Sequence, residues 1–494
     1  MKYALNYLKE HPETLWLIVI LALSTLLRLA FIHEPFDRDE GQYATIAQEI
    51  LRGGLPYRDA IEIKPPGTFY LYALAIGMFG ATIEAVRMFA ALYSMLTALA
   101  IYGVARHIGG TRAGLCSALL YGVFSTIPRL QGNSNTEVFL VLPMTAGVWC
   151  LLLAMDTQKR SYLYGVGLCA ALAMLVKPVA LPVVVLECML IPFSRSGTVF
   201  SKDSALDLAA FLFPITACAV AAIAYFHLHG ALGDFLYWTV EFPRRYKDLV
   251  LFQDVPLGAV LRYLRSTLVV PALLGIPAAV WLAMTKRTVA GSLPLLLILA
   301  VSLAIALPGK NFPHYYFMII PFLAIPGGVG LVLITKMPRV PACLASVAVL
   351  GAFVYSAERN FRFYTSYSPE QVMVASYSST TFVDSIRVAR YLREHTRPDD
   401  YIFQWGFEPE LYFLAGRRCP NPFLVSFLPG WSKDPQQAIG KMKQTLADKK
   451  PAYIVLQPEW ADYEGIFEVN DYLKRNCSEE MKMGFAVIFR CSAH

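Results

Sequence analysis

Long apolar runs are the feature that most constrains how this chain can fold. About eleven runs are long enough to cross the hydrocarbon core of a bilayer, which takes roughly 20 mostly apolar residues in an α-helix. They lie near residues 14–33, 85–105, 113–128, 138–155, 162–176, 179–193, 206–228, 266–284, 291–307, 315–334 and 341–356. The composition agrees, because 56% of the 494 residues are hydrophobic and only 16% are charged. We therefore expect an α-helical polytopic membrane protein, and exclude secreted, cytosolic and disordered chains.

The charges in the short loops predict which side of the membrane each loop faces. Cytoplasmic loops of membrane proteins carry an excess of Lys and Arg. Two such residues occur in each of six short loops, at 1–13, 106–112, 156–161, 194–205, 285–290 and 335–341. We therefore expect a cytoplasmic N-terminus, with the long loops 34–84 and 229–265 and the tail from about residue 357 on the outer side. This orientation depends on 162–193, which we split at Lys177-Pro178 into two spans; as one tilted span it would invert everything after it.

The chain changes character after residue 356. The elements that follow read as helices at 384–395, 410–415 and 435–447 and as strands at 401–405 and 453–456. Because helices and strands alternate, we expect a transmembrane domain at 1–356, which includes the first outer loop 34–84, and an extracytoplasmic α/β domain at 357–494. The sequence allows a disulfide between Cys477 and Cys491 in the second domain without establishing it.

The first outer loop places an acid where an apolar helix face is expected. Residues 35–52 have apolar positions at helical spacing, which predicts an amphipathic helix lying in the membrane interface. Asp39 precedes the apolar Tyr43 by four residues, so we expect it on the buried face in the first turn. The residues expected to point the other way are Gln42, Thr45, Gln48 and Glu49.

Two interpretations of this acid remain open. In one, Asp39 and Glu40 complement the helix dipole and are neutralised by Arg38 or Arg28. In the other, Asp39 is a general base held against the bilayer surface, because a carboxylate on an apolar face is costly unless it has a partner or a function.

Basic residues on the outer side are candidate phosphate contacts. Lys64 precedes two prolines and the apolar helix 68–79, which places its ammonium at headgroup depth. It is either a snorkelling lysine beside a rigid turn or a contact for an anionic lipid head. The other outer basic residues considered in the same way are Arg58, Arg244, Arg245 and Lys310.

Two further residues stand at the outer ends of spans. Glu137 ends the loop 129–137 just where a span begins, and it can simply belong to a helix N-terminus capped by Asn135 or Thr136. His314 is a base, a ligand or an interface residue. No Cys, His or carboxylate spacing indicates a metal site, no Gly-rich phosphate loop occurs, and the net charge of +7 without a basic run argues against nucleic acid.

Acids and cations beside hydrocarbon suit a substrate with an anionic phosphate head and a lipid tail. A carboxylate can take the proton of an attacking hydroxyl while cations stabilise the charge on a departing phosphate. The competing interpretations are a lipid or polysaccharide transporter without transferase activity, and an outer domain that the spans merely anchor. Charges clustered on one outer loop, rather than lining facing helices at mid-membrane, argue against transport, and about eleven spans far exceed what an anchor needs.

Several stretches together resemble one group of enzymes. They are residues 39–50 (Asp-Glu-Gly-Gln-Tyr-Ala-Thr-Ile-Ala-Gln-Glu-Ile), Lys64-Pro65-Pro66, Glu137, residues 310–315 (Lys-Asn-Phe-Pro-His-Tyr), and residues 389–399 and 405–417 of the tail. They resemble the lipid-phosphate-dependent glycosyltransferases of the C-type membrane fold. Within that group they look like bacterial members of the dolichyl-phosphate-mannose protein mannosyltransferase family, which is related to the lipid A aminoarabinose transferases.

The resemblance implies an inverting transfer of one sugar from a polyprenyl-phosphate donor to a lipid, glycan or protein acceptor at the outer face of a bacterial inner membrane. It implies that no cofactor or metal is required, that Asp39 activates the acceptor, and that Lys64 holds the donor phosphate with a cation from a later loop. At Glu137 relatives often carry Asp. The candidate catalytic residues are thus Asp39, Glu40 and Glu137, and the candidate substrate-binding residues are Lys64, Arg58, Tyr43, Arg244, Arg245, Lys310, His314 and Tyr315.

Overall fold

The computed structural model describes residues 10–194, 201–244, 263, 267–309, 312–460, 462–463 and 465–492. The chain divides into two units. Unit 1 comprises Met1–Ile32, Arg87–Ala222 and Phe252–Tyr367, and unit 2 comprises His33–Val86, Ile223–Leu251 and Ser368–His494. The first outer loop therefore folds together with the C-terminal segment, from which more than 280 residues separate it in the sequence.

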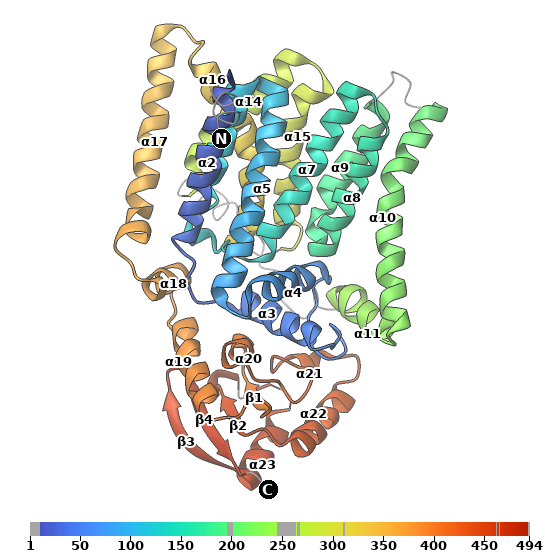
Figure 1. The fold of residues 1–494 in the computed structure, drawn as a ribbon, viewed down its shortest axis with the longest axis vertical. Helices are drawn as coiled ribbons and strands as arrows, with labels where there is room; N and C mark the ends of the chain where they lie inside the picture. Colours follow the sequence, from blue (N-terminus) through green and yellow to red (C-terminus); the bar gives the residue numbers. More distant parts are fainter. Residues whose placement is uncertain are drawn as a thin grey trace. The chain divides into compact units, whose positions relative to one another are not determined.

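Unit 1 is built from apolar helices that run side by side (Figure 1). Their bounds are α2 (Pro12–Leu29), α5 (Ile83–Gly109), α6 (Thr111–Phe124), α7 (Thr136–Thr157), α8 (Ser161–Val176), α9 (Leu181–Leu190), α10 (Lys202–Leu228), α14 (Val269–Lys286), α15 (Val289–Ala306), α16 (Ile320–Ile334) and α17 (Arg339–Thr365). Short 3-10 turns join them at η1 (Pro128–Leu130), η2 (Pro178–Ala180), η3 (Ile191–Phe193) and η5 (Pro313–Ile319). Eight helical segments in the described part of the chain are long and apolar enough to cross a membrane.

Each predicted apolar run coincides with a helical segment. Three of the runs form shorter segments, namely α6, α8 and the stretch from η2 to η3. The stretch 162–193 is broken where Lys177 adopts an extended backbone (φ −158°, ψ 122°) before Pro178, since proline disfavours the helical conformation in the residue before it. This break agrees with the expected split into two helices, while the exact number of membrane crossings remains a prediction.

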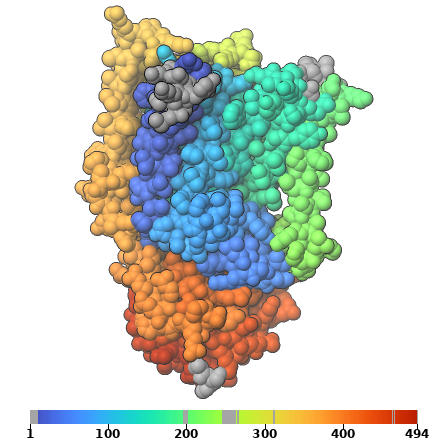
Figure 2. Space-filling model, viewed as in Figure 1, coloured from blue at the N-terminus to red at the C-terminus, as the bar shows by residue number. Residues whose placement is uncertain are grey.

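Helix α17 leaves most of its apolar surface uncovered within unit 1. Only 6% of its most apolar window is buried, and Val340, Leu344 and Val347 are each more than 60% exposed. Figure 2 shows this light-orange helix along one side of the bundle. A continuous apolar surface of this length is far larger than a soluble monomer exposes, and it suits hydrocarbon. The chain is a polytopic membrane protein.

Unit 2 combines short helices with one small sheet. Its helices are α3 (Arg38–Leu51), α4 (Gly67–Phe79), α11 (Leu232–Leu236), the π-helical turn η4 (Tyr237–Glu241), α18 (Pro369–Tyr377), α19 (Thr381–Glu394), α20 (Glu410–Ala415), α21 (Leu428–Trp431), α22 (Pro435–Lys449), η6 (Pro458–Trp460) and α23 (Ile466–Asn476). Its strands are β1 (Ile402–Trp405), β2 (Tyr453–Leu456), β3 (Cys477–Met483) and β4 (Ala486–Cys491). The expected helices and strands of the tail are all present, and α18, α21, α23, β3 and β4 are additions.

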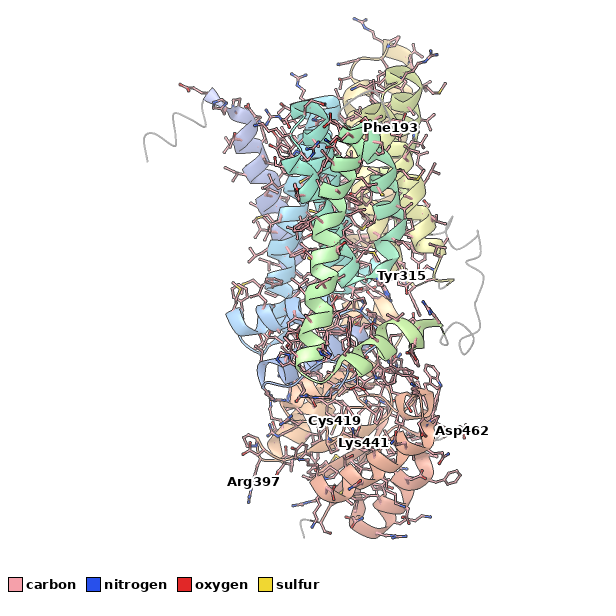
Figure 3. All side chains as sticks on the ribbon, turned by 90° about the vertical axis from the view of Figure 1, so that its right-hand side faces the viewer. Phe193, Tyr315, Arg397, Cys419, Lys441 and Asp462 are labelled. Atoms are coloured by element: carbon pink, nitrogen blue, oxygen red, sulfur yellow. A yellow bond between two sulfur atoms is a disulfide. The ribbon has the colours of Figure 1, made fainter. Side chains whose placement is uncertain are left out.

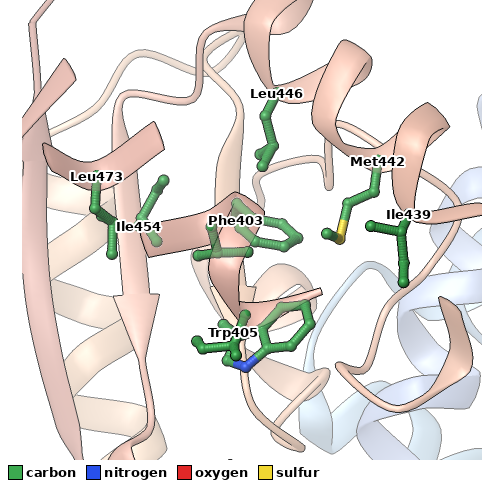
Figure 4. Packing of buried hydrophobic residues seen from close by; sticks show 9 residues of the cluster. Phe403, Trp405, Ile439, Met442, Leu446, Ile454 and Leu473 are labelled. Atoms are coloured by element: carbon green, nitrogen blue, oxygen red, sulfur yellow. The ribbon is translucent and has the colours of Figure 1, made fainter. Parts of the chain in front are cut away.

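The sheet has the strand order β1-β2-β4-β3. Strands β1 and β2 are parallel because the chain returns through α22, whereas β4 pairs antiparallel with both β2 and β3. Phe403 and Trp405 of β1 pack against Ile439, Met442 and Leu446 of α22 to form the core of this part (Figure 4). This core anchors the segment 406–423, which follows β1 and carries the residues that contact α3.

Helix α3 forms over the predicted range but is buried on nearly all sides. Glu40 through Glu49 are all buried, including the Gln42, Thr45, Gln48 and Glu49 positions expected on a polar outer face. The reason lies within unit 2: the Thr45 hydroxyl donates a hydrogen bond to the backbone oxygen of Pro409 (3.0 Å), and Gln42 donates to the backbone oxygen of Ile61 (3.2 Å). The polar face thus meets protein instead of water.

A disulfide joins Cys477 to Cys491, which are directly opposite each other in the antiparallel pair β3–β4. The sequence left this pairing possible without establishing it, and the structure shows it. Cys419, by contrast, has a free thiol.

Candidate functional site

Asp39 stands in the first turn of α3, which begins with a capping box. The carboxylate of Asp37 accepts a hydrogen bond from the backbone nitrogen of Glu40 (2.8 Å), and the Glu40 carboxylate accepts one from the backbone nitrogen of Asp37 (3.2 Å). These two acids occupy the buried positions of the turn. The side chain of Asp39 is 32% exposed, so the expectation that it lies on the buried face is wrong.

Lys64 is held beside this acid. Its Nζ lies 3.4 Å from Oδ2 of Asp39 and 3.1 Å from Oε1 of Glu62, and 4.9 Å from the centre of the Tyr43 ring. The hydroxyl of Tyr57 donates a hydrogen bond to the backbone oxygen of Lys64 (2.8 Å) and fixes the chain there. A carboxylate, an ammonium and an aromatic face that the sequence singled out are therefore brought together.

Glu62 is a member of this cluster that the sequence reasoning missed. It is buried, and Gln42 donates to its Oε2 at 3.2 Å while Lys64 occupies Oε1. An acid two residues before a candidate lysine, on the same side of an extended stretch, is the signal that could have found it.

Burial raises the pKa of Asp37, the acid that caps α3. Desolvation, followed by the charges of Glu40 and Asp39, raises the pKa of Asp37 to about 8. The Tyr377 hydroxyl donates to Oδ2 of Asp37 and opposes this rise. The N-cap of the helix that carries Asp39 is therefore sensitive to pH near neutrality.

Of the other basic candidates in the outer loops, Arg58 and Arg244 lie in the described part of the chain, and both are exposed. Arg58 is exposed and pairs with Asp59 at 2.7 Å, and it donates to the backbone oxygen of His229 at 3.3 Å. Arg244 is exposed at the end of the helical turn that follows η4. Arg245 and Lys310 lie outside the described residues.

A second charged pair lies inside unit 1. Glu137 is buried in the first turn of α7, where the Asn135 carboxamide caps the helix, and Lys177 donates a hydrogen bond to Glu137 Oε1. The Lys177 ammonium also lies 4.2 Å from the centre of the Tyr315 ring, which contacts the ring of His314 edge-on at 4.9 Å. Three of the candidate residues, Glu137, His314 and Tyr315, thus fall into one cluster.

Lys177 is the central member of this cluster, and the sequence reasoning did not include it among the site residues. The signal was present, because a lysine inside an apolar stretch of membrane-spanning length is a functional candidate by default. Figure 3 shows Tyr315 at the end of the unit 1 helices opposite to Phe193. Phe193 precedes the loop 194–205 that we expect in the cytoplasm, so the cluster lies toward the expected outer end of this unit.

Arg28 contributes to unit 1 by holding a loop. Its guanidinium donates to the backbone oxygens of Ser125 (3.0 Å), Gly132 (3.1 Å) and Asn133 (2.8 Å). These bonds orient the segment that leads into α7 and thereby into Glu137.

No group of three or more His, Cys, Asp or Glu among the described residues is arranged to hold a metal ion. The clusters around Lys64 and Lys177 each pair carboxylates with an ammonium instead.

Comparisons with known proteins show which family and which fold this chain resembles. Residues 63–226 match the family model described as dolichyl-phosphate-mannose-protein mannosyltransferase. The crystal structure of ArnT from Cupriavidus metallidurans bound to undecaprenyl phosphate aligns with 97% of this chain and 98% of its own, with a TM-score of 0.66 and 16% identity. The chain has the ArnT fold. The resemblance to the C-type membrane glycosyltransferases that the motifs indicated is confirmed.

Curated relatives match over part of the chain. An undecaprenyl phosphate-α-4-amino-4-deoxy-L-arabinose arabinosyl transferase of Pseudomonas savastanoi is 33% identical over 127 residues, which are 24% of this chain and 24% of the relative. A second such transferase, from Pseudomonas fluorescens, is 30% identical over 171 residues, 33% of this chain and 29% of the relative. The matched segments thus span 24% and 29% of the length of these two relatives.

Proposed function

We propose that this protein is an inverting glycosyltransferase that moves one sugar from a polyprenyl-phosphate donor to a lipid, glycan or protein acceptor. The observation that carries the proposal is the Asp39–Lys64 pair, in which a carboxylate that is about one third exposed and an ammonium lie 3.4 Å apart at the start of a buried helix. The ArnT fold supports it, as does the match to a mannosyltransferase family model across Lys64 and Glu137.

The proposed reaction is a single displacement. The acceptor hydroxyl oxygen forms a bond to the anomeric carbon of the sugar while the bond from that carbon to the phosphate oxygen breaks. Asp39 takes the hydroxyl proton, and the polyprenyl phosphate leaves with the bonding electron pair. Lys64 stabilises the charge that grows on the leaving phosphate.

The surroundings of Lys64 suit this role. Its ammonium forms ion pairs with two carboxylates, those of Asp39 and Glu62. An arriving phosphate therefore competes with Asp39 for the same cation. Contact with phosphate then loosens the hold of Lys64 on Asp39 and leaves that carboxylate available as a base. Glu40, whose carboxylate closes the capping box, supports Asp39 by fixing the first turn.

We assign the Glu137–Lys177 cluster a separate part in binding. A buried carboxylate with ammonium and aromatic neighbours is suited to hydrogen-bond sugar hydroxyls or an amino group, and Glu137 can also act as a second acid. Because the two curated relatives transfer an amino-pentose, an aminopentosyl donor is the first to test.

We propose a bacterial inner-membrane location with the tail, residues 357–494, on the extracytoplasmic side of a transmembrane domain at 1–356. The Cys477–Cys491 disulfide supports this side, since such bonds persist in oxidising compartments.

The experiment supplies purified protein with polyprenyl-phosphate sugars and candidate acceptors and measures sugar transfer. Asp39→Asn should lower kcat by about 10²- to 10⁴-fold, the usual share of general base catalysis. The control is Glu84→Gln, which removes an exposed acid of the same unit that pairs with His33 at 3.0 Å and should leave kcat unchanged. Full transfer by a folded Asp39→Asn protein would remove Asp39 as the base, and no transfer with any donor would overturn the proposal.

A further inference from the structure

Arg38, the residue before Asp39, is tied to the tail. Its Nη2 and Nε lie 2.7 Å and 3.1 Å from Oε1 of Glu408, and its Nε also donates to the backbone oxygen of Phe407 (3.0 Å). The guanidinium lies 4.8 Å from the centre of the Phe407 ring. The carboxylate of Glu408 is almost fully buried, with 1% of its side chain exposed. The start of α3 is therefore held by a charge that has no access to water.

Glu408 has a second acid as its neighbour. Glu410, the first residue of α20, is fully buried, and its Oε1 accepts a hydrogen bond from the Ser385 hydroxyl (2.7 Å). Each of these two carboxyl groups lies close enough to the other to change its pKa. No donor from any other described residue reaches the Oε2 atom of either one. A single proton held between the two Oε2 atoms satisfies both, whereas two bare carboxylates would repel each other in a buried place.

Glu410 also packs directly against α3. A Cβ placed on Gly41 would lie 2.2 Å from the Cβ of Glu410 and 2.7 Å from its Cα, so the two helices touch backbone to backbone. Thr45 adds a hydrogen bond to the oxygen of Pro409, which lies between the two acids. A shift of Glu410 must therefore move Gly41, which is two residues from Asp39.

We propose that Arg38 and the proton-sharing Glu408–Glu410 pair are positioning residues for Asp39, and that loss of the shared proton at alkaline pH displaces the start of α3 and lowers transfer. This inference rests on the proposed function of Asp39. It assigns the tail a part in the reaction, because the tail supplies both acids.

The charges around the pair favour one proton over none. Among the described residues, Arg38 from α3 contributes a cation in contact with Glu408, while Asp37 beside Arg38 and Glu459 from η6 contribute negative charge. Ser385 of α19 and Gln404 of β1 contribute neutral hydrogen bonds. Burial, and then the charge of Glu408, raises the pKa of Glu410 well above its ordinary value. With the raised pKa, the protonated form stabilises the fold at low and neutral pH, and that contribution is lost as pH rises.

The test is the pH profile of transfer in wild type, Glu410→Gln and Glu408→Gln. In Glu410→Gln the amide NH₂ takes the place of the shared proton and the amide oxygen still accepts from Ser385, so we expect kcat at neutral pH within about threefold of wild type. The alkaline fall in transfer that we expect for wild type should then be reduced or shifted to higher pH. Glu408→Gln leaves Arg38 without its anion, and we expect kcat to fall about tenfold or more with the donor KM little changed.

Two controls separate the outcomes. Glu479→Gln removes an exposed acid of β3 that is not among the groups acting on the pair, and it should keep the wild-type profile. Thermal unfolding at each pH shows whether Glu410→Gln is folded and has lost the alkaline destabilisation. Transfer by Glu410→Gln with an unchanged alkaline fall would overturn the positioning proposal alone. A Glu408→Gln variant that raised donor KM and kept kcat would also overturn it, whereas absence of transfer in wild type at every pH would overturn the proposed function itself.

Discussion

The ammonium of Lys64 lies 3.4 Å from the carboxylate of Asp39, and the buried Glu62 takes a second place on the same ammonium at 3.1 Å. Lys64 is thus shared between an acid that can reach solvent and one that cannot.

Substitution of these residues should separate donor binding from base catalysis. Lys64→Ala removes the proposed phosphate contact, and we expect it to raise the donor KM roughly tenfold to a hundredfold, as the loss of a charged hydrogen bond predicts. Glu62→Gln removes one negative charge from the same ammonium but no base, so it should lower kcat far less than Asp39→Asn. Initial rates over a range of donor concentrations check both, and an unaltered donor KM in Lys64→Ala would exclude Lys64 from the phosphate site.

The Glu137–Lys177 pair should behave as a buried ion pair. Lys177→Met leaves the Glu137 carboxylate buried without its cation, which we expect to destabilise the folded protein by about 3–5 kcal/mol. Adding Glu137→Gln to this variant should recover part of that loss, because the uncompensated charge is gone. Thermal unfolding of the single and double variants in one detergent gives the interaction free energy between the two side chains. Strictly additive changes in the free energy of unfolding would show that the two side chains do not interact.

Gly41 should tolerate no side chain. Gly41→Ala places a Cβ within 2.2 Å of Glu410, and overpacking of this kind costs about 1–3 kcal/mol or more. We expect both lower stability and lower transfer. The matched control is Gly440→Ala in α22, where a Cβ meets nothing within 4 Å and alanine should stabilise the helix by about 0.5–1 kcal/mol. Equal effects of the two substitutions would contradict the close contact between α3 and α20.

The N-cap of α3 should give stability a pH dependence near neutrality. Because burial raises the pKa of Asp37 to about 8, its protonated form contributes stability that is complete below the ordinary aspartate pKa and is lost as pH rises through about 8. Asp37→Asn keeps an oxygen that can cap the helix and removes the titration. The midpoint temperature of thermal unfolding should therefore fall more steeply between neutral and alkaline pH for wild type than for Asp37→Asn. Parallel curves of midpoint temperature against pH would contradict the raised pKa.

Local patterns in the sequence predicted most of the helices. Runs of apolar residues located the spans because a helix in hydrocarbon must be apolar over its length. The order of elements around β1, α20 and α22 followed from period and turn residues in the same way. Strand β3 was missed because its sequence, Cys-Ser-Glu-Glu-Met-Lys-Met, is mostly polar and exposed and pairs with β4 on one side alone.

Contacts between distant segments set the limits of the prediction for the candidate site. The amphipathic pattern of α3 gave its range but not the burial of its polar face, since the partners Pro409 and Glu410 lie more than 360 residues away in the sequence. Asp39 was expected on the buried side because periodicity assigns faces and cannot show that Asp37 and Glu40 turn inward to form the cap. Lys177 served in the sequence analysis only to mark the split of 162–193, because its partner Glu137 lies on another helix.

An ion pair with the tail holds each end of α3. The cation belongs to α3 in one pair and to the tail in the other. Arg38 donates to Glu408, and at the other end Glu49 accepts from Arg418 at 2.7 Å. The loop that carries Asp39 and the tail segment 408–418 must consequently be exchanged together when segments of related proteins are combined. A chimaera that receives the tail of a relative will be active only if it also receives that relative's first loop, and chimaeras with both segments from one parent should outperform those with either alone.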